Sequence, residues 1–117
     1  MSFFVRARFE VRDQRQHDFE EAALALRDQA REEPGALNYR WFSAGAGSYL
    51  VIEEYVDSAA AMAHNARGAH LLAHLNECAE MVSAELYGPL GPEVREWVEA
   101  HPQAIAFPEF PGHGTED

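Results

Sequence analysis

Residues 37–56 read LNYRWFSAGAGSYLVIEEYV, and this stretch decides the fold. Leu37–Ser43 is rich in aromatic residues, and 48–56 is rich in aromatic and β-branched residues, the types that strands favour. Between the two lies Gly45-Ala46-Gly47, a small and flexible connection. The pattern predicts a β-hairpin.

The residues before the hairpin predict a strand followed by a helix. Residues 3–11 place Phe3, Val5, Ala7, Phe9 and Val11 on one parity and Arg6, Arg8 and Glu10 on the other, as a half-buried strand does. Apolar residues then recur at helical spacing from Phe19 to Ala30. Pro34-Gly35 ends this helix, because proline cannot extend the hydrogen-bond ladder.

The residues after the hairpin repeat this order as helix and strand. Asp57 is a good N-cap for an alanine-rich helix, which Arg67-Gly68 interrupts before a second helical segment. The buried stripe of that segment is predicted to comprise Leu71, Leu75, Cys78 and Val82, and a fourth strand is expected at 83–87. The order βαββαβ predicts an α+β, ferredoxin-like fold, with a four-stranded antiparallel sheet and its helices on one face.

The predicted sheet has one bare face, although aromatic side chains occur on both parities of its second strand. A symmetric homodimer that pairs two such sheets would bury this face and form a dimeric barrel. Alternatively, the C-terminal segment folds back over it. We expect a barrel domain at 1–90 and an extension at 91–117, with a helix around Trp97, a short strand at 104–107 and a frayed tail from 108.

Composition narrows the classes of function. The chain of 117 residues has the length of one domain, and its net charge is −11, with nine arginines and no lysine. Nucleic acid and anionic membranes are therefore not expected as partners, because both are polyanionic. The first residues lack the apolar run of a signal peptide, and Cys78 is the only cysteine, so we expect a cytoplasmic protein.

Two motifs carry a family resemblance. Residues 32–39, EEPGALNY, and 53–57, EEYVD, the latter followed by His64 and His70, resemble the antibiotic biosynthesis monooxygenase family. This resemblance implies a homodimeric α+β barrel. It also implies oxidation of a small phenolic or quinol-like aromatic molecule by dioxygen, with no cofactor and no metal.

The resemblance makes His64 and His70 the candidate catalytic bases, since imidazole titrates near neutral pH. The competing interpretation is structural, because both histidines flank the predicted helix break and can serve there as capping residues.

Four further residues are candidates for substrate binding. Tyr55 and Trp41 are predicted to shape an aromatic pocket. Asn38 and Arg40 share the opposite parity of the second strand, where the arginine is a candidate for stabilising an oxyanion. The competing interpretation is that aromatic residues of strands belong to the core or to an interface.

Other chemistries have little support in the sequence. His70, His74 and Glu77 recur at one-turn spacing, but no further ligand stands at a recognisable spacing, so no metal is assigned. Phosphate-binding, dinucleotide-binding and nucleophile-elbow motifs do not occur. Two alternatives to an enzyme stay open: a small-molecule-binding or stress-associated barrel, and a purely structural dimer.

Overall fold

The predicted hairpin is confirmed in the computed structural model, which describes residues 1–111 of the chain. Its strands, β2 (Ala36–Ser43) and β3 (Ser48–Tyr55), pair antiparallel. Gly45, Ala46 and Gly47 have φ values of 81°, 52° and 80°, so all three turn residues adopt the left-handed region. Glycine enters that region without steric cost, which explains the two glycines in the turn.

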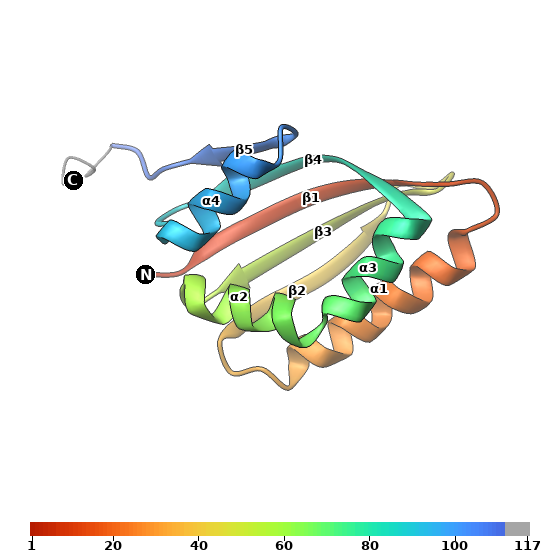
Figure 1. Cartoon of the computed structure of the whole chain (residues 1–117), viewed down its shortest axis with the longest axis horizontal. Coiled ribbons are helices and arrows are strands. Elements are labelled where there is room, and N and C mark those ends of the chain that lie inside the picture. Colours follow the sequence, from red (N-terminus) through yellow and green to blue (C-terminus); the bar gives the residue numbers. More distant parts are fainter. Residues whose placement is uncertain (112–117) are drawn as a thin grey trace.

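The predicted ferredoxin-like α+β order is also confirmed (Figure 1). The further elements of this order are β1 (Phe3–Val11), α1 (Gln16–Arg31), α2 (Ser58–Arg67), α3 (Ala69–Cys78) and β4 (Ala79–Tyr87). In residues 1–111, no helix combines the length and apolar character that crossing a bilayer requires.

The break between α2 and α3 falls at Gly68, where the chain passes close to α1. A Cβ atom added at Gly68 would lie 2.9 Å from a methyl carbon of Leu26 and 2.9 Å from the side-chain oxygen of Gln29. A larger residue at this position would therefore require the Leu26 and Gln29 side chains of α1 to move. Glycine suits this close approach between α3 and α1.

The C-terminal extension changes the sheet from the predicted one. The predicted strand forms as β5 (Ala104–Phe107), and it pairs parallel to β4, so the sheet has five strands in the order β2-β3-β1-β4-β5. The expected four-stranded antiparallel sheet is thereby extended into a mixed one. The parallel direction follows from α4 (Pro92–Ala100), a crossover helix that returns the chain to the edge beside β4. Of the predicted frayed tail, 112–117 lies outside the described residues.

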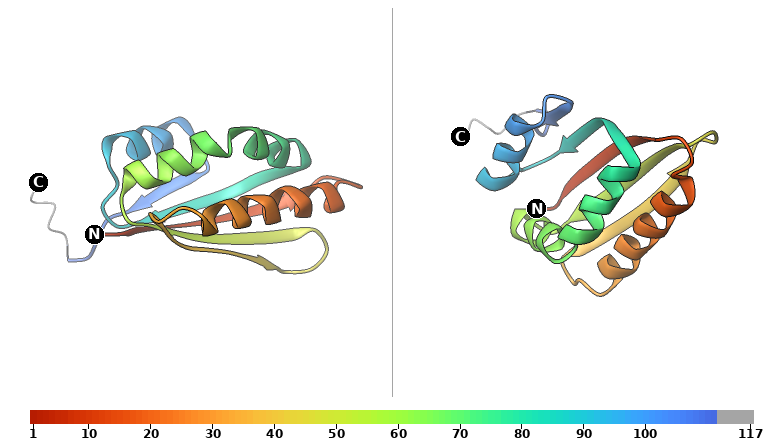
Figure 2. Two further views of the ribbon diagram at one scale, coloured as in Figure 1. Left: turned by 90° about the horizontal axis from the view of Figure 1, so that it is seen from below. Right: turned by 45° about the vertical axis from the view of Figure 1, so that its right-hand side comes forward.

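The helices gather on one face of the sheet (Figure 2). The core lies between the two layers and includes the fully buried side chains of Phe3, Phe19, Leu26 and Leu75. The opposite face, here called the outer sheet face, carries exposed apolar side chains, which are Phe4, Phe42, Ile105 and Phe107. Within residues 1–111 the chain does not fold back over this face, because the extension lies at the sheet edge and on the helix side.

Candidate functional site

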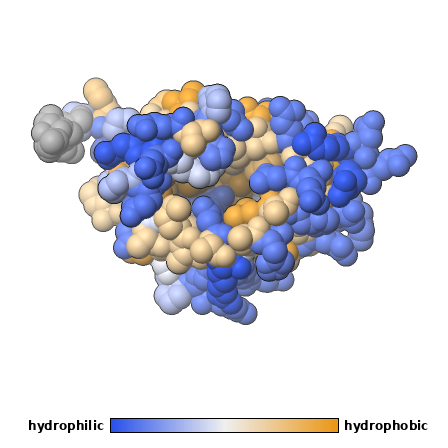
Figure 3. Space-filling view, in the orientation of Figure 1, coloured by the Kyte–Doolittle hydropathy of each residue, from blue (hydrophilic) through white to orange (hydrophobic). Residues whose placement is uncertain are grey.

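A cavity of about 440 Å³ opens on the helix side of the sheet. Its floor is formed by β1, β3 and β4, and its sides by α2 and α3 on one flank and by α4 on the other. Figure 3 shows the hollow, with hydrophobic residues inside it and hydrophilic residues around much of its edge. The apolar wall includes Phe3, Leu72, Leu75, Leu86, Val94 and Trp97. This volume lies within the range of about 300–1,000 Å³ that is typical of small-molecule sites.

Glu53 places a carboxylate in this apolar cavity. It pairs with Val5 of β1, and strand alternation turns both side chains toward the helices. Surrounding protein atoms remove water from Glu53, and this burial raises the pKa of its carboxyl group above the ordinary value of 4.5. A hydrogen bond from the Tyr55 hydroxyl and the nearby His64 act in the opposite direction, but burial is the largest effect. Glu53 is thus suited to holding a proton that it can transfer.

His101, at the end of α4, contributes a second titratable group to the cavity. Its Nδ1 lies 2.7 Å from the carbonyl oxygen of Trp97, and its ring stacks on the Trp97 ring with 4.1 Å between centroids. A carbonyl oxygen only accepts hydrogen bonds, so Nδ1 carries the hydrogen that is donated. In the neutral ring, Nε2 then keeps its lone pair and can accept a proton.

Amide and charged side chains complete the polar part of the lining. They come from α2, α3 and the two ends of β4, and they are Arg12, Asn65, Asn76, Glu80 and Gln103. Such groups can orient a ligand by hydrogen bonds while the apolar wall supplies most of the contact area.

The structure buries His64 beside the cavity rather than in its lining. The His64 side chain is 1% exposed, and its Nδ1 lies 2.7 Å from Glu33 Oε1. Its ring packs 5.8 Å from the Tyr55 ring, measured between centroids, and Tyr55 does line the cavity. Within residues 1–111, His64 Nε2 has no hydrogen-bond partner. His64 therefore lies behind the cavity wall, in contact with Tyr55.

The other predicted site residues lie apart from one another. His70 is exposed on α3 and does not line the cavity. Trp41 packs in the core against Phe9 and Phe19. Asn38 and Arg40 both lie on the outer sheet face.

Asn38 and Arg40 each contact a neighbouring side chain on the outer sheet face. Asn38 donates a 2.6 Å hydrogen bond to Glu54, and the Arg40 guanidinium lies 5.2 Å from the centre of the Phe42 ring. Of the six predicted residues, the structure therefore brings only Tyr55 into the cavity lining.

Sequence reasoning missed Glu53 and His101 as cavity residues. The signal for Glu53 was present, because it shares the parity of Tyr55 and Val51 on β3 and alternation turns all three inward. His101 gave no such signal, because its place depends on how α4 packs against the sheet.

Comparison with known proteins supports this fold. The chain is similar to MupZ from Pseudomonas fluorescens, with 21% identity, a TM-score of 0.76, and coverage of 92% of this chain and 89% of that one. Rv0793 from Mycobacterium tuberculosis has 23% identity and a TM-score of 0.68, with coverage of 78% of this chain and 97% of that one. SnoaB from Streptomyces nogalater, a cofactor-independent oxygenase, has 17% identity and a TM-score of 0.63, with coverage of 73% of this chain and 89% of that one. None of the curated proteins matches the chain.

Identities this low establish a shared fold and nothing more. The family is shown by a different comparison, in which the family model described as antibiotic biosynthesis monooxygenase matches residues 2–76, more than half of the chain. The match covers both motifs that suggested the resemblance. The chain belongs to the antibiotic biosynthesis monooxygenase family.

Proposed function

We propose that the protein is a cofactor-independent monooxygenase that oxidises a phenolic or quinol-like aromatic molecule with dioxygen in the cavity between sheet and helices. The observation that carries the proposal is an apolar cavity with two groups for proton transfer, Glu53 and His101. Family membership and the likeness to the oxygenase SnoaB agree with it.

The cavity suits a flat, uncharged ring. Its wall presents the aromatic side chains of Phe3, Tyr55 and Trp97, which favour stacked or edge-on contacts with an aromatic ligand. A largely apolar site also limits water, which would otherwise stabilise the phenol and quench a reactive oxygen intermediate.

In the proposed reaction the substrate supplies all the electrons. His101 Nε2 takes the phenol proton, and the resulting phenolate transfers electron density to dioxygen. A carbon–oxygen bond forms at the ring, and His101 returns its proton to the outer peroxide oxygen.

Loss of the ring hydrogen to His101 then breaks the oxygen–oxygen bond and forms the second carbonyl group. The expelled hydroxide takes the proton of Glu53 and leaves as water, and His101 afterwards restores the proton to Glu53. One phenol and one dioxygen thus give one quinone and one water, and no external reductant is consumed.

The predicted residues take supporting roles in this proposal. Tyr55 binds Glu53, and His64 packs against Tyr55, so we propose that both position the carboxyl group. His64 and His70 are the alternative bases that the sequence suggested. His64 is the better placed of the two, because it contacts a residue of the cavity wall.

We also propose that two subunits pair through their outer sheet faces. The exposed apolar side chains of this face favour burial against a second copy. Arg6 already binds Glu85 at 2.7 Å within one subunit, so this charge is compensated before association. Asn38 and Arg40 would then belong to the interface and not to the catalytic cavity.

A panel of hydroquinones and anthrones, incubated with the protein in air and under nitrogen with a chelator present, tests the function. We expect quinone absorbance to rise only in air, and to rise more slowly with the Glu53→Gln variant. Ligands that raise the melting temperature without being oxidised would instead indicate a small-molecule-binding protein.

A further inference from the structure

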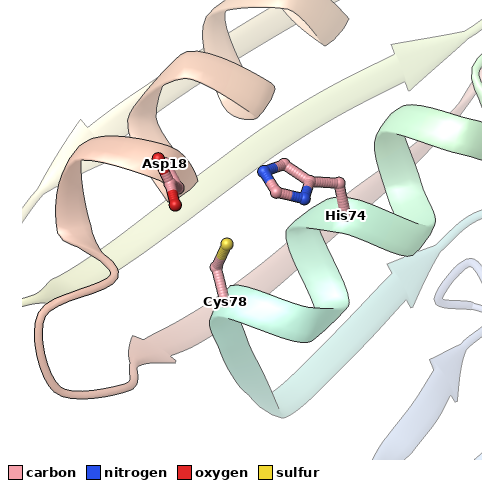
Figure 4. A group of neighbouring side chains, drawn as sticks. All are labelled: Asp18, His74 and Cys78. Atoms are coloured by element: carbon pink, nitrogen blue, oxygen red, sulfur yellow. The ribbon is translucent and has the colours of Figure 1, made fainter.

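The fold assembles a second group of chemically active side chains away from the cavity. Asp18 of α1 and His74 and Cys78 of α3 bring one ligand atom each to within 4.8 Å of one another (Figure 4). None of the three lines the cavity. We propose that this group binds one divalent transition-metal ion of the zinc type.

The geometry of the two helices explains the group. His74 and Cys78 are four residues apart on α3 and therefore share one face, and α1 packs against α3 so that Asp18 meets that face. Thiolate, imidazole and carboxylate together form a donor set that suits zinc, and three protein ligands leave a fourth position open for water.

The site requires only a small contraction to hold an ion. Zinc–ligand bonds of about 2.0–2.3 Å place the ligand atoms of a tetrahedral site roughly 3.3–3.8 Å apart. The side chains of Asp18 and His74 are 47% and 45% exposed, so both can rotate toward a buried Cys78 that acts as the fixed anchor.

A neighbouring carboxylate prepares His74 for this role. Glu77 Oε1 lies 3.5 Å from His74 Nδ1, an arrangement that favours a hydrogen on Nδ1 and leaves Nε2 free to bind metal. Carboxylate–histidine–metal arrangements of this kind orient the ligand ring and increase its basicity.

Arg15 contacts two of the three proposed ligands. One of its terminal nitrogens lies 3.4 Å from Cys78 Sγ, and its Nε lies 3.6 Å from Asp18. A metal ion would compete with this guanidinium for the same two donors. The structure thus predicts that Arg15 weakens metal binding.

The sequence alone did not show this site. The one-turn spacing of His70, His74 and Glu77 suggested a weak strip on one helix, whereas the fold replaces His70 with Cys78 and adds Asp18 from a helix more than 50 residues earlier. His70 consequently provides a matched control on the same helix.

Titration with Co²⁺ tests the proposal, using tag-free, chemically reduced protein. We expect one ion per chain and a thiolate-to-cobalt charge-transfer band in the near ultraviolet, which Zn²⁺ abolishes by displacement. Cys78→Ser should remove the band. His74→Asn and Asp18→Asn should weaken binding by more than the roughly tenfold that loss of even an outer partner costs.

Two further variants make the result specific. His70→Asn should leave the affinity unchanged, and Arg15→Gln should increase it, while far-ultraviolet circular dichroism confirms that every variant is folded. The proposal is overturned if the wild-type protein shows no charge-transfer band, if His70→Asn weakens binding as much as His74→Asn, or if Arg15→Gln does not strengthen it.

Discussion

Tyr55 donates its hydroxyl hydrogen to the carboxylate of Glu53, two residues earlier on the same face of β3. Both side chains point toward the helices, so this strand directs a carboxylate to the side where an antiparallel sheet normally buries apolar residues. Placing an acid there opposes folding, because burial penalises its charged form. A local conflict of this kind is expected where a residue serves function.

The first prediction concerns the pH dependence of stability. Because burial raises the pKa of Glu53, the folded state keeps a proton that the unfolded chain releases above about pH 4.5. The free energy of unfolding should therefore fall as the pH rises from 4.5 through the higher pKa of the folded state. Glu53→Gln removes this loss, so its melting temperature relative to the wild type should increase with pH, as measured by thermal denaturation at pH 5 and pH 8.

Glu54→Gln is the matched control, because Glu54 is the next residue of β3 and points to the outer sheet face, where it binds Ser2 and Asn38. An equal pH effect in both variants would contradict the burial argument.

The second prediction compares two adjacent glutamates. Glu33 is 15% exposed and accepts the hydrogen bond of buried His64, whereas Glu32 is 67% exposed and binds Arg67. Glu33→Ala should destabilise the protein by about 1–3 kcal/mol, because it leaves the buried His64 Nδ1 without its carboxylate partner. Glu32→Ala should change stability by less than about 0.5 kcal/mol. Urea denaturation measures the free energy of unfolding of both variants. Similar losses would contradict the stabilising role of the Glu33–His64 hydrogen bond.

The third prediction concerns the proposed dimer. Ile52 lies on the outer sheet face between Arg6 and Arg40. A lysine there can extend into water in a free subunit, but in a buried interface it adds a positive charge beside two arginines, which is costly. Ile52→Lys should shift the protein from dimer to folded monomer in analytical ultracentrifugation. Leu24→Lys, at an exposed position on α1, should remain dimeric. A monomeric wild-type protein would rule the interface out.

The fourth prediction concerns the extension. His101→Gln should reduce turnover of an oxidised phenol by about a hundredfold, the lower range for loss of a general base, with little change in KM. His17→Gln, an exposed change on α1, should leave turnover unaffected. The pH profile distinguishes proton transfer from packing: the wild-type rate should depend on pH through one basic group, and that dependence should be absent from the variant.

Short-range signals predicted most of the fold. Alternation in 3–11, the turn at Gly45–Gly47 and the break at Gly68 each act through local geometry, and each was confirmed. The start of β4 was misplaced, because Val82 follows the helical spacing of Leu71, Leu75 and Cys78 even though the helix ends at Cys78. An apolar residue that fits both the helical and the strand period cannot by itself mark the boundary between a helix and a strand.

Contacts between distant segments were harder to predict. The parallel addition of β5, the entry of His101 into the cavity and the meeting of Asp18 with Cys78 all depend on how α4 and α1 pack. The family motifs suggested His64 and His70 as bases. The spacing of a motif does not show, however, whether a histidine lines the cavity or lies behind the residues that line it. Strand parity alone would have identified Glu53.

Oxygen-isotope labelling tests the central claim, which is that the cavity uses dioxygen to oxidise a phenolic ring without a cofactor. Chelator-treated protein is incubated with an oxidised member of the hydroquinone and anthrone panel under ¹⁸O₂, and product and oxygen uptake are measured together. We predict one ¹⁸O atom per quinone, one dioxygen consumed per product, and a strong reduction with Glu53→Gln. Unlabelled quinone accompanied by an equal amount of hydrogen peroxide, or labelled quinone formed equally well by the variant, would contradict the account.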